Sequence, residues 1–327
     1  MKTTDFVKAT LTLFDTISKF DKIIIFRHIS PDPDALGSQN ALYNLLNIIY
    51  PTGKDIKLAG ETPDNLKWVD EIGRHAPNCR EITPEFANGA LGIVLDTANV
   101  DRIDGDWQDT CMFKIDHHPA PKDCLPYDSN YTWEYIDTDA SSTSEIIANM
   151  YQKVMEYYDT VSAQDLLYVG IAGDTGRFMY DNATAKTLET VASLKRLTPK
   201  VRHAVNMKLD SINEVQANLM GYAYDRRYYL NDNVVSLIVP YSQIRGGHEA
   251  DAYVTIGALQ RLEKPEIAVV AVENENGSYR IHLRSKFKPI NELAAKYNGG
   301  GHPLAAGAKA KDRDEVAKLF HELAEEW

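Results

Sequence analysis

The chain has 327 residues, of which 44% are hydrophobic, 25% charged and 9% aromatic. This composition excludes a disordered or fibrous protein, and the length is enough for about two domains with a core each. There are 35 basic and 47 acidic residues, which give a formal net charge of −12. An acidic chain cannot cover a long phosphate backbone with basic side chains, so we expect no binding to long duplex DNA. Phosphate esters remain possible substrates if cations reverse the field inside one cleft.

Cysteine content and hydropathy point to a reducing, aqueous compartment. The three cysteines, Cys79, Cys111 and Cys124, form no CxxC pair, and their odd number argues against a disulfide framework. The first residues lack the features of a secretory signal, and no apolar stretch approaches the roughly 20 residues needed to span a bilayer. We therefore expect a cytoplasmic protein that does not bind membranes. A homodimer is expected from base rates alone.

The first two thirds of the chain alternate short apolar runs with helical patterns. This alternation predicts an α/β fold with a mostly parallel sheet flanked by helices. The predicted strands are residues 22–26, 56–59, 91–95 and 112–115, and the predicted helices are residues 35–50, 144–158 and 163–173. The first strand, the first helix and the second strand form one βαβ unit, in which Pro51 closes the helix.

From Thr198 the sequence becomes polar and keeps a helical pattern, which predicts a helical linker over residues 198–230. A smaller α/β domain follows it. Its predicted strands are residues 234–239, 267–272 and 279–283, and its predicted helices are residues 252–262, 290–297 and 314–326. We therefore expect a first α/β domain over residues 1–197 and a second, smaller one over residues 231–327. Neither a Walker loop nor a GxGxxG motif follows a strand, so nucleotide binding by those motifs is unsupported.

Three residues with metal-ligating side chains, His28, Asp32 and Asp34, follow the first predicted strand within seven positions. A turn at the carboxyl end of a strand in an open α/β sheet faces the crevice where ligands bind. Two aspartates at the start of a helix can instead cap that helix. This segment alone leaves both interpretations open.

Three further segments carry similar residues. Asp96 ends an apolar strand, and Asp116, His117 and His118 end the next one. A single carboxylate at a strand end is often a loop cap, whereas histidine is the commonest metal ligand. Asp174 lies in a Gly-Asp-Thr-Gly sequence that alone would be typical of a helix C-terminus.

Together, the four segments would crowd four aspartates and two or three histidines at one edge of one sheet. Four unpaired carboxylates in a cleft repel one another, so they protonate or acquire cations, and two divalent ions balance them. A mostly oxygen ligand set with imidazoles and no thiolate favours Mn²⁺, with Mg²⁺, Co²⁺ or Fe²⁺ as alternatives, over structural zinc. Two such ions about 3.5–4 Å apart are suited to in-line phosphoryl displacement. We therefore expect hydrolysis of a phosphate ester.

In chain order, these segments resemble the four motifs of the DHH phosphoesterase superfamily. The resemblance implies one ion held by His28, Asp32 and Asp96, and a second ion for which Asp96 is a bridging ligand. It also implies that His118 faces the scissile phosphate and that Asp116 orients the histidines from behind. The remaining ligands that it implies for the second ion are Asp34, His117 and Asp174.

Two motifs in the second domain are suited to binding an anion. An Arg-Ser pair ends a predicted strand, and a glycine run followed by a histidine could expose consecutive amides as an anion nest. A glycine run is more often a flexible turn, and a strand arginine more often a surface charge. Both motifs resemble the RSK and GGGH motifs of the DHH-associated C-terminal domain, which implies that they bind the far end of the substrate. These candidate substrate-binding residues are Arg284, Ser285, Gly299, Gly300, Gly301 and His302.

Within the superfamily, the patterns DTANxxR, ASSTSE and GDTGRF resemble the NrnA-like group of bifunctional oligoribonucleases and pAp phosphatases. This implies a Mn²⁺-dependent enzyme that hydrolyses short RNA oligonucleotides to mononucleotides, and 3′-phosphoadenosine 5′-phosphate (pAp) to AMP. Arg102 and Arg177 are further candidates for the same cleft, with structural ion pairing as the alternative.

The same metal centre suits other substrates, which the sequence does not rank. The alternatives are linear pApA, cyclic dinucleotides, and pyrophosphate or polyphosphate. A non-catalytic nucleotide-binding regulator is the alternative from another class, although no metal-ligating aspartate is missing. The direction of strand attack, the native metal and the oligomeric state also remain open.

Overall fold

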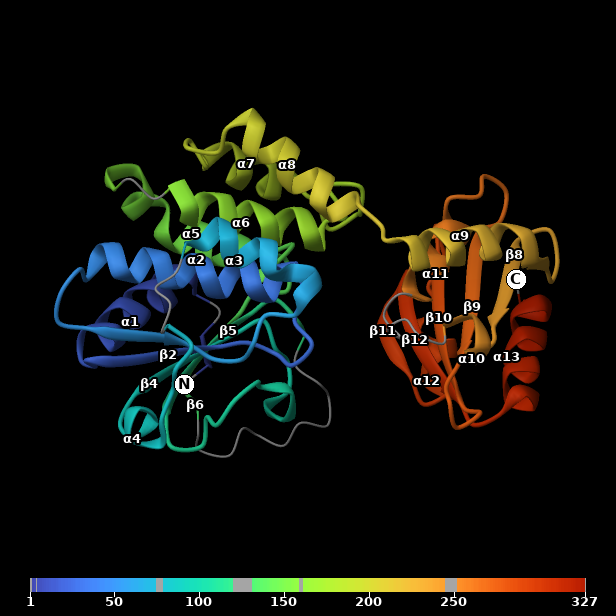
Figure 1. Ribbon diagram of the computed structural model, residues 1–327, viewed down its shortest axis with the longest axis horizontal. Helices are drawn as coiled ribbons and strands as arrows, with labels where there is room; N and C mark the ends of the chain where they lie inside the picture. Colours follow the sequence, from blue (N-terminus) through green and yellow to red (C-terminus); the bar gives the residue numbers. More distant parts are fainter. Residues whose placement is uncertain are drawn as a thin grey trace. The chain divides into compact units, whose positions relative to one another are not determined.

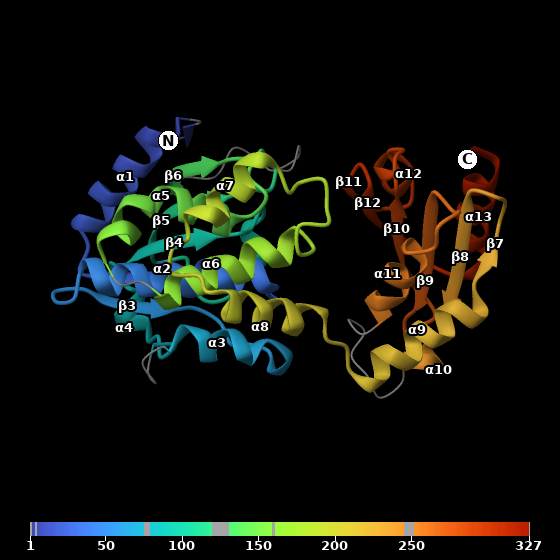
Figure 2. The same ribbon diagram turned by 90° about the horizontal axis from the view of Figure 1, so that it is seen from above.

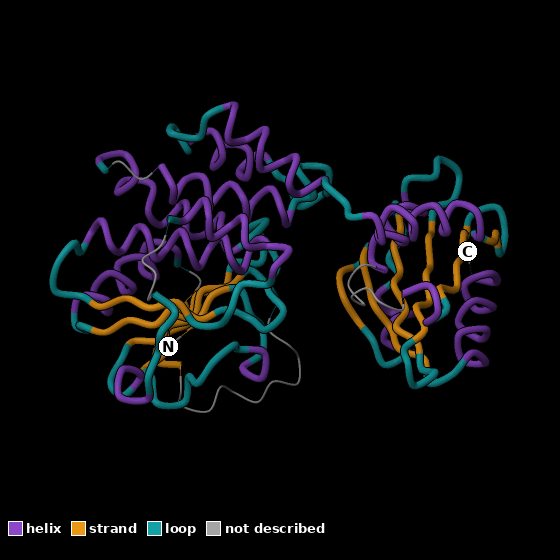
Figure 3. Tube along the Cα trace, in the orientation of Figure 1, coloured by secondary structure: helices purple, strands orange, loops and turns teal. Residues whose placement is uncertain are grey.

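The protein is described here from a computed structural model, which covers residues 2–3, 5–74, 79–119, 131–158, 161–244 and 252–326 (Figure 1). The chain divides into two compact units, Met1–Asp210 and Ser211–Trp327. Each unit contains a six-stranded sheet and several helices, which confirms the α/β class (Figure 3). The division between the two units falls inside the linker predicted at residues 198–230. The predicted limits of the two domains stay predictions.

The first unit places six parallel strands in the order β1-β6-β5-β4-β2-β3. The strands are β1 (Lys2–Thr3), β2 (Lys22–Phe26), β3 (Asp55–Leu58), β4 (Leu91–Leu95), β5 (Cys111–Asp116) and β6 (Tyr131–Ile136). The α-helices are α1 (Phe6–Ser18), α2 (Pro33–Ile49), α3 (Lys67–Gly73), α4 (Pro84–Ala87), α5 (Thr143–Tyr157), α6 (Val161–Asp174), α7 (Ala185–Ser193) and α8 (Pro199–Asp210). Two short 3₁₀ helices are η1 (Asp64–Leu66) and η2 (Val100–Arg102).

The predicted strands and helices of this unit are all present, with ends that differ by no more than about two residues. The sequence prediction missed β1, β6, α1, α3, α4 and α7. In β6, aromatic and polar residues alternate from Tyr131 to Tyr135, but burial does not follow this alternation, because Trp133 is only partly buried and Glu134 is buried.

Both faces of the first sheet are covered, as is usual for a parallel sheet. Along β2, Ile23 and Ile25 point into the main core, which they share with α1, α2, α5 and α6. Ile24 and Phe26 point into a smaller core on the other face, next to α4. Figure 1 shows α2, α5 and α6 on one side of the sheet and α4 on the other.

Helices α2 and α6 touch through their backbones. A Cβ atom on Gly37 of α2 would lie 2.7 Å from the carbonyl oxygen of Leu166 and 2.8 Å from the amide nitrogen of Gly170. Only a residue without a side chain allows this approach. The contact fixes the start of α2 against the second half of α6, and these two helix ends carry Asp34 and Asp174.

The second unit contains a mixed sheet in the order β11-β12-β10-β9-β8-β7, in which only β8 and β9 are parallel among the described pairs (Figure 2). Its predicted elements are present, whereas β7, α10, β11 and β12 were missed. The strands are β7 (Tyr228–Tyr229), β8 (Val234–Val239), β9 (Ile267–Glu273), β10 (Tyr279–Ser285), β11 (Gly300–His302) and β12 (Ala305–Ala310). The helices are α9 (Glu214–Arg226), α10 (Tyr241–Ile244), α11 (Val254–Gln260), α12 (Asn291–Lys296) and α13 (Arg313–Glu326).

Residues of the predicted linker are built into both units. Val205 of α8 is buried in the core of the first unit, whereas Leu219 and Ala223 of α9 are buried in a core of the second. On the other face of the second sheet, α12 and α13 pack over the strands. Within the described ranges, no helix combines the length and the apolar character that crossing a membrane requires.

Replacing Gly37 by alanine should destabilise the first unit by about 1–3 kcal/mol, because the new methyl group would force the backbones of α2 and α6 apart. Urea denaturation measures the free energy of unfolding. Gly221→Ala is the matched control, since a Cβ there meets nothing within 4 Å and α9 should gain about 1 kcal/mol. A Gly37→Ala protein as stable as the wild type would contradict the close contact.

Candidate metal centre

Three neighbouring strands bring the predicted ligands to one edge of the first sheet. His28 follows β2, Asp96 follows β4, and Asp116 to His118 end and follow β5. Because β5, β4 and β2 are adjacent and parallel, their carboxyl ends meet at the same edge. The start of α2 supplies Asp32 and Asp34, and Asp174 is the last residue of α6.

His28, Asp32 and Asp96 form one group of possible metal ligands, with ligating atoms within 4.8 Å of one another. The Nε2 atom of His28 lies 3.6 Å from an oxygen of Asp32 and 3.5 Å from Oδ2 of Asp96. Its Nδ1 atom lies 2.8 Å from the carbonyl oxygen of Ile29. This hydrogen bond assigns the proton of the neutral ring to Nδ1, which leaves the Nε2 lone pair facing the two carboxylates.

Asp32 combines the two roles that the sequence left open. Its Oδ1 atom caps α2 by accepting hydrogen bonds from the amides of Asp34, at 3.0 Å, and Ala35, at 2.9 Å. Its other oxygen, Oδ2, faces His28. Capping therefore fixes the carboxylate and leaves one oxygen available as a ligand.

Asp34, His117 and Asp174 form a second group within the same 4.8 Å limit. The Nε2 atom of His117 lies 3.2 Å from Oδ2 of Asp174 and 3.5 Å from Oδ1 of Asp96. Asp96 also belongs to a third group with His117 and His118. The structure therefore brings together every residue that the sequence proposed as a metal ligand.

Asp96 connects these groups. The residue is only 1% exposed and has a backbone φ of +56°, a conformation that is uncommon for residues other than glycine and often occurs at functional sites. Its Oδ2 atom and the Nε2 atom of His117 are buried and have no hydrogen-bond partner among the described residues. Buried polar atoms are rarely left unpartnered, and cations between the carboxylates would satisfy both. The donor set therefore fits divalent metal ions.

The electrostatics of the cluster also favour added positive charge. Burial raises the pKa of Asp34 well above its usual value, and it raises the pKa of Asp174 to about 6. Burial lowers the pKa of His28, but neighbouring carboxylates outweigh this effect and raise it to about 10. The same balance raises the pKa of His117 to about 12. In the metal-free protein, Asp34 therefore favours its protonated form, and His28 and His117 favour the imidazolium form beside the Asp96 carboxylate.

Asp116 holds His118 in place. Its Oδ1 atom accepts hydrogen bonds from the backbone amide of His118, at 3.0 Å, and from Nδ1 of the same residue, at 2.9 Å. Its Oδ2 atom lies 3.3 Å from the ammonium group of Lys114. The side chain of His118 is 37% exposed, against 8% for His28 and 11% for His117, so it is the histidine best placed to meet a substrate.

The start of α5 supplies donors that the sequence analysis did not assign to the site. The amides of Thr143 and Ser144 donate to the two oxygens of Asp34, at 2.7 and 2.9 Å. The Thr143 hydroxyl donates to Oδ1 of Asp96 at 3.2 Å. Ser142 followed three positions later by an acidic residue is a capping-box pattern, which could have located this helix start.

The two further arginine candidates differ in their surroundings. Arg102 lies near the first ligand group, with its Nη2 atom 3.4 Å from Nδ1 of His28. Arg177 instead forms an ion pair of 2.6 Å with Asp210. Arg177 therefore takes part in a structural ion pair, whereas Arg102 remains a candidate residue of the cleft.

In the second unit, Arg284 and Ser285 are already engaged in local contacts. The Arg284 guanidinium donates to the carbonyl of Leu283 and to the hydroxyl of Tyr253, and it lies 5.3 Å from the centre of the tyrosine ring. Ser285 is 3% exposed, and its hydroxyl accepts from the amide of Lys288. The serine therefore stabilises the turn after β10.

The glycine run is an edge strand, which corrects the expectation of a nest of exposed amides. The amide of Gly299 donates to the carbonyl of Ala294 at 3.0 Å, so it is not available to an anion. Gly300, Gly301 and His302 form β11, which pairs with β12 at the edge of the sheet. Glycine is required at position 301 because its φ is +137° and a Cβ would lie 2.6 Å from the carbonyl oxygen of Ala305.

Comparison with known proteins agrees with this geometry. Residues 22–171 match the DHH family, N-terminal domain, and residues 235–327 match the DHHA1 domain. The chain is 33% identical over 317 residues to a probable bifunctional oligoribonuclease and PAP phosphatase NrnA of Streptococcus mutans, which covers 95% of this chain and 97% of that protein. It is 35% identical over 318 residues to the bifunctional oligoribonuclease and PAP phosphatase NrnA of Bacillus subtilis, with 95% and 96% covered.

A solved structure shows the same fold. An exopolyphosphatase-related protein from Bacteroides fragilis superposes with a TM-score of 0.81 at 23% identity, covering 98% of this chain and 96% of that one. The chain belongs to the DHH family and is a phosphoesterase.

Replacing Thr143 by valine should weaken Mn²⁺ binding about 10- to 100-fold, because the Asp96 carboxylate would lose the hydroxyl that orients it. Thr143→Ser keeps the hydroxyl and should bind Mn²⁺ like the wild type. Isothermal titration calorimetry measures the affinity, and both variants retain the backbone amide that holds Asp34. Equal affinities of the valine and serine variants would contradict the role of the hydroxyl.

Proposed function

We propose that this phosphoesterase hydrolyses short RNA oligonucleotides to mononucleotides and pAp to AMP, with Mn²⁺ as the native metal at two positions. Mg²⁺ and Co²⁺ are the alternative ions. The NrnA relatives, which are named for these two activities, support the substrates. The oxygen-rich ligand groups with imidazoles support the metal. We place the activity in the cytoplasm, where cysteines that form no CxxC pair are usual.

The observation that carries this proposal is the position of Asp96 between two ligand groups. Its Oδ2 atom faces His28, and its Oδ1 atom faces His117, each at 3.5 Å. One carboxylate with an oxygen toward each group is the arrangement expected of a ligand that bridges two cations. The first position would be held by His28, Asp32 and Asp96, and the remaining ligands of the second would be Asp34, His117 and Asp174.

Two divalent cations at such a site supply an activated water and stabilise the charge that develops on a phosphate during hydrolysis. The chain's own residues position the groups that act with them. Asp116 fixes His118 through Nδ1 and helps to raise the pKa of this imidazole, and in the imidazolium form the other ring nitrogen can donate a hydrogen bond to an oxygen of the scissile phosphate. The amides of Thr143 and Ser144 fix Asp34, so its oxygens need not reorganise during the reaction.

The second unit is proposed to bind the part of the substrate that does not react. Arg284 carries a fixed positive charge, and contact with Tyr253 restrains its guanidinium. His302 lies on the exposed edge strand β11. These residues can bind a terminal phosphate or a ribose hydroxyl. The flanking glycines allow the substrate backbone to approach, and Ser285 supports the arginine by stabilising the adjacent turn.

A substrate panel with Mn²⁺ tests the proposal. We expect phosphate release from pAp and mononucleotide release from RNA dimers to pentamers. Asp96→Asn should lower both activities by about 100-fold or more, because it removes the charge that both ligand groups share. Asp101→Asn is the matched control, since Asp101 is exposed and belongs to none of the three ligand groups.

The same substrate panel distinguishes the proposed function from its alternatives. Faster hydrolysis of cyclic dinucleotides, linear pApA, pyrophosphate or polyphosphate would replace the proposed substrates. A protein that binds Mn²⁺ and hydrolyses none of these esters would be a nucleotide-binding regulator. Unchanged activity of Asp96→Asn would contradict the two-metal proposal itself.

A further inference from the structure

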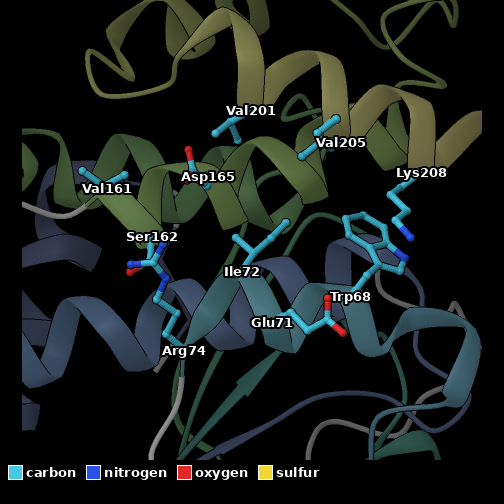
Figure 4. Close-up of a pocket in the computed structure, with 11 residues that line it drawn as sticks. Trp68, Glu71, Ile72, Arg74, Val161, Ser162, Asp165, Val201, Val205 and Lys208 are labelled. Atoms are coloured by element: carbon cyan, nitrogen blue, oxygen red, sulfur yellow. The ribbon is translucent and has the colours of Figure 1, made fainter.

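A pocket in the first unit contains none of the metal ligands. It has a volume of about 640 Å³ and lies between α3, α6 and α8 (Figure 4). Asp165, one of its lining residues, precedes Asp174 on α6 by nine positions, which is about 14 Å along the helix axis. The pocket is therefore separate from the metal centre, although one helix contributes to both.

The most unusual lining residue is Asp165. It is only 7% exposed, and its Oδ1 atom is buried without a hydrogen-bond partner among the described residues. Burial raises the pKa of this carboxyl to about 6, although the positive charge of Arg74 lowers it in part. A buried carboxylate oxygen that lines a pocket and accepts no hydrogen bond from the described residues indicates a ligand that donates one.

The rest of the lining indicates the other parts of that ligand. Ile72, Val161, Val201 and Val205 form apolar walls, and Trp68 adds an aromatic ring. Such walls suit a flat, largely apolar body. Figure 4 shows Trp68 and Lys208 toward one end of the pocket, with Arg74 and Asp165 toward the other.

The lining carries two basic residues, Arg74 and Lys208, and two acidic ones, Glu71 and Asp165, and the basic side chains can bind an anionic group of the ligand. The pocket therefore suits a ligand with a hydrogen-bond donor, a flat body and an anionic group. A planar base with hydrogen-bond donors, joined to a phosphate, combines these three features. An ionised carboxylate only accepts hydrogen bonds, and the guanine edge presents two adjacent donors, N1–H and the 2-amino group. Adenine and cytosine present one donor beside an acceptor at the corresponding edge. We propose that this pocket binds a guanine nucleotide, with Asp165 accepting hydrogen bonds from the base.

Calorimetric titration of the metal-free protein with GMP, in the presence of EDTA, tests the proposal. We expect saturable binding of GMP, and binding of IMP that is about tenfold weaker because IMP lacks the 2-amino group. AMP should also bind at least as weakly as IMP. This comparison uses the wild-type protein alone, so it does not depend on the folding of a variant.

Asp165→Asn should weaken GMP binding by a similar factor, because the amide replaces one acceptor by a donor. Asp232→Asn, at an exposed position in the second unit, is the matched control and should bind GMP like the wild type. Absence of GMP binding, equal affinities for GMP and IMP, or unchanged binding by Asp165→Asn would overturn the proposal. Catalysis does not enter these measurements, so failure here leaves the proposed phosphoesterase substrates untouched.

Discussion

The burial of several carboxylates at one sheet edge is the constraint on which the rest of the first unit depends. Asp34 and Asp96 are almost fully buried, and they share their surroundings with Asp174. Charges of like sign in such a place are unfavourable unless donors and cations compensate them. The neighbouring helix ends and histidines compensate the negative charge of these carboxylates.

The fold compensates these charges mainly with backbone groups. Strands β2, β4 and β5 deliver the side chains, while the first amides of α5 bind Asp34 and the first amides of α2 bind Asp32. A helix start carries a partial positive charge and unpaired amides, so it is a suitable partner for a carboxylate. The glycine contact between α2 and α6 then holds Asp34 and Asp174 near each other. Backbone packing beside the ligands therefore helps to determine ligand geometry.

Much of this site could be predicted because it follows from short-range sequence features. Strands that are apolar throughout, such as β4, can be recognised from the sequence alone. A polar residue that directly follows such a strand lies at the carboxyl edge of a parallel sheet. His28, Asp96 and His117 were found in this way. Their division into two ligand groups came from resemblance to a family and stays a prediction, because the structure shows three overlapping groups, one of which joins Asp96 to His117 and His118.

Other features depend on contacts between distant segments, which spacing does not reveal. Thr143 donates to Asp96 across 47 positions of sequence, and the pocket around Asp165 exists only because α8 packs over α6. The glycine run was misjudged because its neighbour β12 is rich in alanine and glycine, which have low strand propensity, so the pairing that makes it an edge strand was not foreseen. Local patterns thus located the chemistry, while tertiary packing determined which groups support it.

The most direct measurement of the central claim is anomalous diffraction at the manganese absorption edge, from crystals of the protein grown with Mn²⁺. Two peaks per chain are expected, one beside His28 and Asp32 and the other beside His117 and Asp174, with Asp96 between them. A single peak, or peaks elsewhere in the first unit, would contradict the proposal that this carboxylate bridges two ions.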